Sequence, residues 1–586
     1  MNWIVPFIIS VVILAVAIFA GVYCERNKVK RHKLLSGFYI ILVGVAVSAF
    51  VLFIPYYYYA SSTDMRFVQS LLVSLYSVLR TFALDGDYSF FMETVAAGNR
   101  LFSTIYLTYT LIIMVAAPFF TFGVVLSFFK DAKARFRFIM RRKNAVYVFS
   151  QLNERAVVLA KDLSEQKTDK KSEKPVIVFT NVGGDTETEA ELSEQAAEFG
   201  AICFKKDVVS VKVKSRKKLC FFVMGGDDGE NLRHTMKLIE TYKDRAETRI
   251  YLFSTSVESE LVLSSVDKGK VTVRRVDEIR SLINRMLYDN GNMLFDGARA
   301  DENGVKQISV IIAGLGQYGS TMLKTLSWFC QMPGYRLKIT AVDKDKKAEA
   351  KLAYQAPEMM DKKIQGIYSP GMPGYDICVH SDIDATTSNF VDIVKKQTDA
   401  TFAFVALGTD EDNIKVAADL RMQFERMNIK PEIIAVVHSS ETKAALEKVE
   451  NHRHQPYNIK FIGDIESSYT EAVVVSSALE AEALKSHLAW DGAKESEFWD
   501  IEYNYRSSIA TTLHKKARLH CGIKPEEGTD LEHCRWFAYM RSEGYIYSGA
   551  EDAASRNELG KMHHNMVPTY RLDESDLDKD RRVNNA

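Results

Sequence analysis

The residues with the clearest potential for chemistry are three glycines and one aspartate in the stretch 308–343. The glycines form the pattern G-x-G-x-x-G directly after an apolar run, at Gly314, Gly316 and Gly319. Gly314 permits a tight turn, Gly316 lets the backbone approach a phosphate, and Gly319 lets a helix pack on the preceding strand. The carboxylate of Asp343 accepts hydrogen bonds from ribose hydroxyls. The pattern predicts a nucleotide site, against the alternative of the same fold without a ligand.

Two strands and one helix must hold these residues in place. Residues 308–312 are mostly β-branched and apolar, which is typical of a buried parallel strand. An apolar helix pattern begins at Ser320, and the free N–H groups at its N-terminus attract an anion beside Gln317. A second strand, residues 337–342, brings Asp343 to its carboxyl end. Strand, loop, helix, strand and acid follow one another in the order of a Rossmann unit.

An earlier part of the chain repeats this order without its chemistry. Residues 143–300 alternate predicted strands and helices, which indicates a parallel sheet. The loop 150–153 contains no glycine, and the second strand ends in Thr180 and Asn181 instead of an acid. We therefore expect a structural or differently liganded copy, with strands at 145–149, 176–179, 220–224 and 249–253.

A second motif links the two parts of the chain. Residues 226–231 and 408–413 both fit G-x-D-x-x-N after a predicted strand, and they lie about 180 residues apart. Agreement in both motif and position indicates an internal duplication. Asp410 is the aspartate of the second copy. Further strands of the second part are expected at 377–379, 402–406 and 433–437.

Composition excludes several classes of protein. A chain of 586 residues holds three or four domains. Its 75 basic and 75 acidic residues argue against a nucleic-acid binder that depends on global charge. The seven cysteines include no C-x-x-C pair, so they suit a reducing cytosol and support neither a zinc site nor a disulfide framework.

The first 142 residues predict a membrane domain. Three uncharged runs, residues 2–24, 34–63 and 101–129, are each long enough to cross a bilayer. The first run has no basic segment before it, which argues against a cleaved signal peptide. Residues 25–33 and 130–143 are strongly basic, and basic loops stay in the cytoplasm. We therefore expect three crossings, an N-terminus outside the cell, and everything after residue 130 inside it.

The stretch between the second and third crossings is too apolar for a simple loop. Apolar residues recur at helical spacing between Phe67 and Phe82, while Arg66 and Arg80 disfavour a full crossing. A Gly/Asp turn follows. Two interpretations are open, a short helix that leads into a pore or an interfacial amphipathic helix that caps the domain. Pro118 in the third crossing predicts a kink, which is either a gate or a packing adjustment.

The order of crossing helix, short outer helix, turn and crossing helix resembles the pore module of potassium-channel-like proteins. The turn departs from that family, because potassium filters use consecutive carbonyls of a TVGYG-type loop. Here the loop residues are Asp85, Gly86 and Asp87. An acidic ring formed by these aspartates in an oligomer favours cations, without the potassium selectivity of the family.

Tandem Rossmann units behind such a module resemble the RCK (TrkA-N-like) regulatory domains of bacterial potassium channels and transporters. The resemblance implies a nucleotide, either NAD, NADH or an adenine nucleotide. It places this ligand near Gly314, Gly316, Gln317, Gly319, Asp343 and Asp410. It also implies the bacterial inner membrane as the location.

The C-terminal residues, 488–586, combine charged and aromatic side chains. A helix from Leu531 places Glu532 and Arg535 on one face, and Gly544 ends it. The order E-H-x-R-W, R-x-E-G-Y, K-x-H and V-P resembles the RyR domain, which is named after the repeats of ryanodine receptors. An aromatic and cationic pocket for a planar or phosphorylated ligand is one interpretation, and a packed core is the other. The residues concerned are Glu532, Arg535, Trp536, Arg541, Tyr545 and His563.

These observations predict an α-helical membrane domain followed by two α/β Rossmann-like domains and a small, mostly α-helical RyR-like domain. The expected boundaries are 1–142, 143–300, 305–487 and 488–586. The expected partners are membrane lipid, a nucleotide and further copies of the chain, as a tetramer or a dimer. An enzyme is not expected, because a dehydrogenase needs a substrate domain and only His438 at a strand end offers a proton donor.

Three functions fit this architecture. The first is a channel-like protein in which the cytosolic sensors gate cation passage when a nucleotide favours one state. The second is an anti-phage defence effector that disrupts the membrane when a nucleotide second messenger binds. The third is a non-conducting regulatory subunit of an ion transporter.

Overall fold

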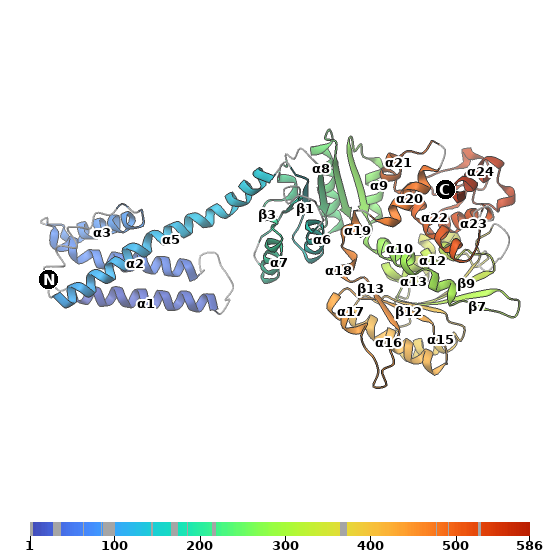
Figure 1. Ribbon diagram of the computed structural model, residues 1–586, viewed down its shortest axis with the longest axis horizontal. Coiled ribbons are helices and arrows are strands. Elements are labelled where there is room, and N and C mark those ends of the chain that lie inside the picture. Colours follow the sequence, from blue (N-terminus) through green and yellow to red (C-terminus); the bar gives the residue numbers. More distant parts are fainter. Residues whose placement is uncertain are drawn as a thin grey trace. The chain divides into compact units, whose positions relative to one another are not determined.

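A computed structural model describes most of the chain (Figure 1). The described residues are 4–26, 37–61, 64–83, 85, 100–141, 144–165, 174–183, 186–211, 213, 218–363, 372–475, 477–489, 492–524 and 529–585. They form two compact units, Met1–Met140 and Arg141–Ala586. Each unit has its own hydrophobic core.

The first unit is helical. Its described helices are α1 (Ile4–Arg26), α2 (Gly37–Ala60), α3 (Arg66–Phe82) and the start of α5 (Arg100–Arg141). Among the described residues, three segments are long and apolar enough to cross a membrane, namely Ile4–Tyr23, Ile40–Ala60 and Arg100–Phe122. The prediction of three apolar helices near the N-terminus is confirmed. Pro118 lies inside α5, and helical residues continue on both sides of it.

Small and hydroxyl-bearing residues join these helices closely. The Ser10 and Ser48 hydroxyls lie 2.5 Å apart, and the Tyr109 hydroxyl lies 2.9 Å from that of Ser48. A Cβ atom added to Gly44 would lie only 2.1 Å from the Cβ of Ala17, so the backbones of α1 and α2 approach each other at this glycine. Small residues and shared hydroxyls are the usual means by which helices associate in hydrocarbon.

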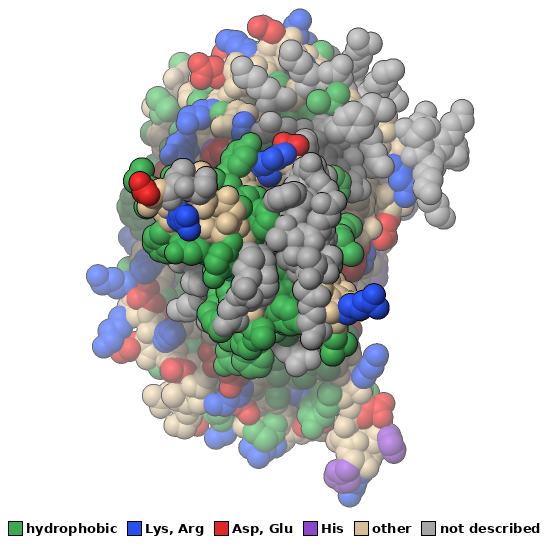
Figure 2. All heavy atoms as spheres, turned by 90° about the vertical axis from the view of Figure 1, so that its left-hand side faces the viewer, with side chains coloured by type: hydrophobic (Ala, Val, Ile, Leu, Met, Phe, Trp, Pro, Cys, Tyr) green, Lys and Arg blue, Asp and Glu red, His purple; other side chains and the backbone are tan. Residues whose placement is uncertain are grey.

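The polarity of α3 is inverted relative to a helix on a water-soluble protein. Its buried face carries Ser70, Ser74, Ser77 and Thr81, and the Tyr57 hydroxyl of α2 lies 2.7 Å from that of Ser77. Its outer face exposes large apolar side chains, among them Phe67, Leu72, Leu75 and Leu79. Hydrophobic side chains gather on the described surface of this unit in Figure 2. An outer face of this kind suits contact with lipid or with another protein surface.

The second unit begins with a six-stranded parallel sheet in the order β3-β2-β1-β4-β5-β6. Its strands are β1 (Val146–Phe149), β2 (Val176–Phe179), β3 (Ile202–Cys203), β4 (Leu219–Val223), β5 (Thr248–Phe253) and β6 (Val271–Val276). The helices between and after them are α6 (Glu154–Ser164), α7 (Glu187–Glu198), η2 (Val208–Ser210), α8 (Asp228–Tyr242), α9 (Val257–Ser265), α10 (Glu278–Asn290) and α11 (Asn292–Asp296).

The second sheet repeats this order as β10-β9-β8-β11-β12-β13. Its parallel strands are β8 (Lys306–Ala313), β9 (Tyr335–Asp343), β10 (Tyr375–Ser381), β11 (Phe402–Val405), β12 (Glu432–Val436) and β13 (Ile459–Ile462). A short strand, β7 (Arg299–Ala300), pairs antiparallel with β8. The helices are α12 (Gln317–Phe329), α13 (Ala348–Gln355), α14 (Pro357–Met360), α15 (Ser388–Lys395), α16 (Asp410–Arg426) and α17 (Ser440–Leu446).

Both sheets have the strand order of the dinucleotide-binding fold. The prediction of two α/β parts with parallel sheets is confirmed. Strands β3, β6 and β13 are absent from the sequence prediction. β3 is two residues long, and β6 contains Arg274 and Arg275, which break the apolar pattern. Arg274 is nevertheless buried, because it pairs with Glu480 of a later helix.

The rest of the chain covers both sheets. Two short helices, α18 (Ile465–Ser468) and α19 (Glu471–Val474), bring Tyr469 and Val474 into the core of the first sheet. The later helices α20 (Ala478–Leu488), α21 (Glu495–Asp500), α22 (Glu502–His520) and α23 (Thr529–Ser542) share a core with the second sheet. For example, the rings of Trp328 in α12 and Tyr539 in α23 are 6.2 Å apart, edge to face. Last come β14 (Ile546–Tyr547), η4 (Ala553–Ser555), β15 (Met562–His563), η5 (Thr569–Arg571) and α24 (Glu574–Asn585).

A network of buried ion pairs ties these covering helices to the first sheet. Arg506 of α22 contacts Glu502 at 2.6 Å, Glu260 of α9 at 2.9 Å and Glu543 at 3.2 Å. Arg280 of α10 also contacts Glu543, at 2.7 Å. Burial alone raises the pKa of Glu543, but the attraction of Arg280 and Arg506 outweighs burial and holds this pKa well below its usual range. The Glu543 carboxylate therefore stays charged in the folded chain.

We expect Glu543→Gln to lower the free energy of unfolding by about 3 kcal/mol at pH 7, because two arginines lose a buried partner. A carboxyl whose pKa is lowered by folding stabilises the protein above its unfolded pKa, and this contribution fades as the pH falls below that value. The deficit of the variant should therefore shrink as the pH falls below 4.5, the ordinary value for glutamate. Urea unfolding of the full chain in detergent, followed by tryptophan fluorescence, measures the difference.

Glu574→Gln is the matched control. Glu574 pairs with Arg581 on α24, and its side chain is 76% exposed. Exposed ion pairs contribute little, so this variant should unfold like the wild type at every pH. Equal stabilities of the Glu543 and Glu574 variants at pH 7 would contradict the proposed role of the buried network.

Candidate functional site

The glycine loop between β8 and α12 is shaped by two close backbone contacts. Gly314 has a φ of +91°, and a Cβ atom there would lie 2.3 Å from the carbonyl oxygen of Ala406. A Cβ atom on Gly319 would lie 1.8 Å from the carbonyl oxygen of Gly314. No atom lies within 4 Å of a Cβ built on Gly316. Packing alone thus requires glycine at 314 and 319, whereas the space beside Gly316 is open to a ligand.

The N-terminus of α12 faces this open space without a side-chain cap. The helix begins at Gln317, and its N-cap residue is Gly316, which has no side chain to accept a hydrogen bond. The first N–H groups of a helix have no partner within the helix and carry partial positive charge. The loop therefore presents backbone donors to an anion.

The corresponding loop of the first sheet is closed by its own side chains. Asn153 caps α6 by accepting a hydrogen bond from the Ala156 N–H at 2.9 Å, and its amide donates to the Met224 carbonyl at 2.8 Å. The Ser150 hydroxyl accepts the Met224 N–H at 3.1 Å. One N–H group at the start of α6 and one after β4 therefore have side-chain partners within the protein, in a loop that contains no glycine.

Asp343 lies at the end of β9, beside the glycine loop. One carboxylate oxygen accepts the Leu315 N–H at 2.6 Å, and the other accepts the Asp345 N–H at 2.7 Å. A carboxylate oxygen has two lone pairs, so each keeps one for a further donor. Asp343 therefore holds the glycine loop in position and can still accept from a ribose hydroxyl.

A cleft of about 540 Å³ lies above these residues. Of the residues predicted for the nucleotide site, Gly314, Gly316, Gln317 and Asp343 line it, and Gly319 and Asp410 do not. It is also lined by residues that the sequence analysis does not assign to a nucleotide, including Tyr318, Lys344, Thr386 and His438. Lys344 directly follows Asp343 in the sequence, and this position is the signal by which the sequence could have indicated Lys344.

Asp410 and Asn413 of the second G-x-D-x-x-N motif join the ends of neighbouring strands. The Asp410 carboxylate accepts the N–H groups of His438 and Ser439, each at 3.0 Å. The Asn413 amide donates to the Val436 carbonyl at 2.9 Å and accepts the Leu407 N–H at 2.5 Å. Asn413 thus connects the residue that follows β11 to the last residue of β12. Asp410 thus positions the strand ends that border the cleft.

The first copy of the motif makes the same contacts. Asp228 accepts the Thr255 N–H at 3.0 Å. Asn231 donates to the Phe253 carbonyl at 3.0 Å and accepts the Gly225 N–H at 2.8 Å. The motif is therefore a structural clamp in both sheets, independent of whether a glycine loop is present. Its repetition, together with the repeated strand order, supports an internal duplication.

The residues predicted for the C-terminal pocket are mostly engaged with one another and with neighbours. Arg535 contacts Glu532 at 2.9 Å, Arg541 contacts Glu358 of α14 at 3.3 Å, and the Tyr545 hydroxyl donates to Glu558 at 2.8 Å. The buried members are Glu532, Arg535, Arg541, Tyr545 and His563. They form the interior of the C-terminal segment, and a ligand pocket there stays a prediction.

Aromatic contacts surround the same cluster. The Trp536 indole N–H donates to the Tyr503 hydroxyl at 3.2 Å, and the ring of His563 lies 5.0 Å from that of Trp536. Arg541 lies over the Phe537 ring, 4.3 Å from its centre. Burial, with a smaller effect of a nearby arginine, lowers the pKa of His563 to about 4, so this histidine is neutral at pH 7.

The acidic turn of the membrane unit is described only at its first residue. The Asp85 side chain is 79% exposed, and the Arg80 guanidinium donates to its backbone carbonyl at 2.6 Å. Gly86 and Asp87 lie outside the described residues. Within the described part of the chain, no group of three or more His, Cys, Asp or Glu side chains lies close enough to hold a metal ion.

We expect Asn413→Ala to lower the free energy of unfolding by about 2 to 4 kcal/mol, because the part-buried Leu407 N–H and the buried Val436 carbonyl lose this partner. Asn231→Ala should have a similar effect, since it removes the same pair of contacts from the first sheet. Urea unfolding of the full chain in detergent provides the measurement. The control is Asn303→Ala, at an exposed turn, which should behave as wild type. Asparagine variants that are no less stable than this control would contradict the clamp.

Comparison with known proteins assigns no family to the chain. No protein-family model matches it, and no curated protein matches it.

Proposed function

We propose that this chain is a channel-like membrane protein whose second sheet binds a nucleotide and thereby regulates the passage of cations. The observation that supports this most directly is the uncapped N-terminus of α12 beside the open space at Gly316, with Asp343 lining the same cleft. The sequence order is that of a Rossmann site, and the strand order of the sheet is the one associated with it.

The cleft offers a place for each part of a nucleotide. The phosphates bind the free N–H groups at the start of α12. The ribose binds the remaining lone pairs of Asp343. Ile383 and Ala385, which follow β10 and line the cleft, provide an apolar surface for the base. A cleft of this size holds NAD, NADH or an adenine nucleotide.

The membrane unit supports the channel part of the proposal. Three segments of membrane-spanning length accompany α3, whose outer face is apolar and which ends just before the acidic turn. Several copies around one axis, as a tetramer or a dimer, would place Asp85 in a ring that attracts cations. The proposed location is the bacterial inner membrane, with the two sheets in the cytoplasm.

Regulation requires a mechanical link between ligand and membrane. The third spanning segment and the chain leading to the first sheet belong to one helix, because α5 extends from Arg100 to Arg141. Only four residues separate the end of α5 from the start of β1 at Val146. A nucleotide that binds one arrangement of the sheets tenfold more tightly shifts the equilibrium by about 1.4 kcal/mol. Through α5 this shift acts on the spanning segment.

Gly316→Asp tests the nucleotide site, because its side chain fills the open space and its charge repels a phosphate. In thermal unfolding of the full chain with NAD, NADH, ATP, ADP or AMP, we expect at least one nucleotide to stabilise the wild type. At a hundred times its Kd the gain is about 2.7 kcal/mol. We expect the Gly316 variant to lose this gain.

Gly226→Asp is the matched control for that experiment. A Cβ atom there also has no atom within 4 Å, but the residue follows β4 of the first sheet, far in the sequence from the glycine loop. The control should keep the full stabilisation. Stabilisation that survives Gly316→Asp would move the nucleotide to another site, and no stabilisation by any nucleotide would contradict nucleotide regulation.

Ion flux through liposomes that contain the purified chain tests the channel. We expect cation flux that depends on the nucleotide found above, and Asp85→Asn should reduce the preference for cations over anions because it removes one of the two aspartates that each copy contributes to the acidic ring. Asp64→Asn, in the same outer stretch, makes the same change of charge and should keep the preference. A leak without ion preference would favour the membrane-disrupting defence effector, and silence would favour the regulatory subunit of a transporter.

A further inference from the structure

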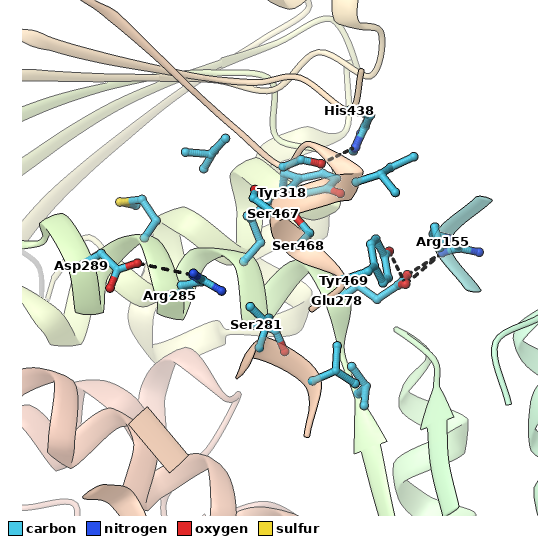
Figure 3. Close-up of a pocket in the computed structure, with 18 of the residues that line it drawn as sticks. Arg155, Glu278, Ser281, Arg285, Asp289, Tyr318, His438, Ser467, Ser468 and Tyr469 are labelled. Carbon is cyan, nitrogen blue, oxygen red and sulfur yellow. Dashed lines mark hydrogen bonds and ion pairs between the residues drawn. The ribbon is translucent and has the colours of Figure 1, made fainter. Parts of the chain in front are cut away.

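A second cavity, of about 440 Å³, lies where segments from both sheets meet (Figure 3). It is bounded by α10 on one side and by the segment from β13 to α19 on another, with Arg155 of α6 and Tyr318 of α12 also in its wall. Tyr318 and His438 line both this cavity and the nucleotide cleft, and their rings lie 5.9 Å apart. The two rings therefore form part of the wall between two separate spaces.

Much of the cavity wall is apolar. Residues from α10, from the end of β13 and from α18 and α19 contribute, namely Leu282, Met286, Ile462, Ile465, Val473 and Val474. A cavity of several hundred Å³ with an apolar wall and a few polar groups has the composition of a small-molecule site.

The acidic groups in the cavity already have partners. Both oxygens of Glu278 accept from the Arg155 guanidinium, at 2.9 and 2.8 Å, and Tyr469 donates to one of them as well. Asp289 faces Arg285 at 3.4 Å. Figure 3 shows these two ion pairs well apart in the view, with Ser281, Ser467 and Ser468 between them. The carboxylates therefore offer little to a ligand that brings hydrogen-bond donors.

Hydrogen-bond donors in the cavity, in contrast, can meet an acceptor that a ligand brings. Burial raises the pKa of Tyr318 to about 12, so its hydroxyl keeps its proton at pH 7. The Ser468 hydroxyl is buried and has no hydrogen-bond partner in the described chain. The Arg285 Nε lies 3.4 Å from the Asp289 carboxylate, and the Arg285 side chain is 45% exposed, so its guanidinium can pair with a further acceptor. A buried donor without an acceptor is costly, so the Ser468 hydroxyl favours a ligand that supplies an acceptor.

We propose that this cavity is a second ligand site, which binds a small organic acid with an apolar body. The acidic group pairs with Arg285 and accepts hydrogen bonds from the Ser468 and Tyr318 hydroxyls. The apolar body lies against the isoleucines and valines of β13, α18 and α19. The site differs from the proposed nucleotide site in its main acid-binding residues, Arg285 and Ser468, and shares the ring of Tyr318 with it.

Binding of 8-anilinonaphthalene-1-sulfonate to the full chain in phosphatidylcholine nanodiscs tests this proposal. The probe combines an aromatic body with a sulfonate and fluoresces in apolar surroundings, and empty nanodiscs give the lipid background. We expect one saturable site per chain. Octanoate should displace the probe, whereas octylammonium, which has a similar body and the opposite charge, should not.

Variants then locate the site. Ser468→Trp fills the cavity, and Arg285→Gln removes the charge of an exposed helix residue, so each should weaken the saturable binding about tenfold or more. Arg582→Gln is the matched control, because Arg582 pairs with Asp578 in the same i,i+4 arrangement on α24. This control and Gly316→Asp should bind the probe as wild type does, which separates this site from the nucleotide cleft.

Three results would overturn the proposal. The first is the absence of a saturable component in the wild type. The second is equal displacement by octanoate and octylammonium, which would show that the acidic group is not recognised. The third is saturable binding that persists in Arg285→Gln, a variant whose change lies on the surface of α10 and leaves the core intact.

Discussion

The hydrogen bonds of Asn413 across the ends of β11 and β12 hold the edge of the sheet on which the candidate nucleotide site depends. Parallel strands end with N–H and carbonyl groups that have no further strand residue to pair with, and buried groups of this kind need partners. Asn413 supplies a partner to each strand, and Asp410 fixes the backbone at His438. Because side chains satisfy these strand ends, the sheet stays ordered beside the glycine loop. The backbone N–H groups at the start of α12 have no side-chain cap.

The two sheets show how one clamp can support two different outcomes. Asn231 repeats the contacts of Asn413, so the strand ends of the first sheet are held in the same way. The difference lies one loop away, where Asn153 caps α6 and Gly316 leaves α12 uncapped. Replacement of glycine by residues that satisfy the helix N-terminus stabilises the loop and removes the anion site. The first sheet thus resembles a scaffold, and the second keeps the open donors that a ligand requires.

Contacts between distant segments make the second unit a single mechanical body. Tyr469, which follows the second sheet, packs in the core of the first and donates to Glu278. Arg506 joins α9, α22 and the end of α23 through buried ion pairs. Tyr318 belongs to the glycine motif and also borders the cavity near Tyr469. Tyr318 therefore connects the cleft beside the glycine loop to the region where the two sheets meet.

The sequence by itself determined the features that depend on neighbouring residues. These include the three described helices that are long and apolar enough to cross a membrane, most strands of both sheets and the need for glycine at 314 and 319, because apolar periodicity and backbone freedom are local properties. Strand β6 was not predicted, because Arg274 interrupts its apolar pattern. Arg274 is buried through its pairing with Glu480, about two hundred positions later. Only the tertiary structure decided that backbone N–H groups occupy Asp410, that Glu532 and Arg535 are interior, and that a donor-rich cavity exists. Each of these features depends on which segments, distant in the sequence, pack together. The same local sequence pattern is compatible with many different tertiary contacts.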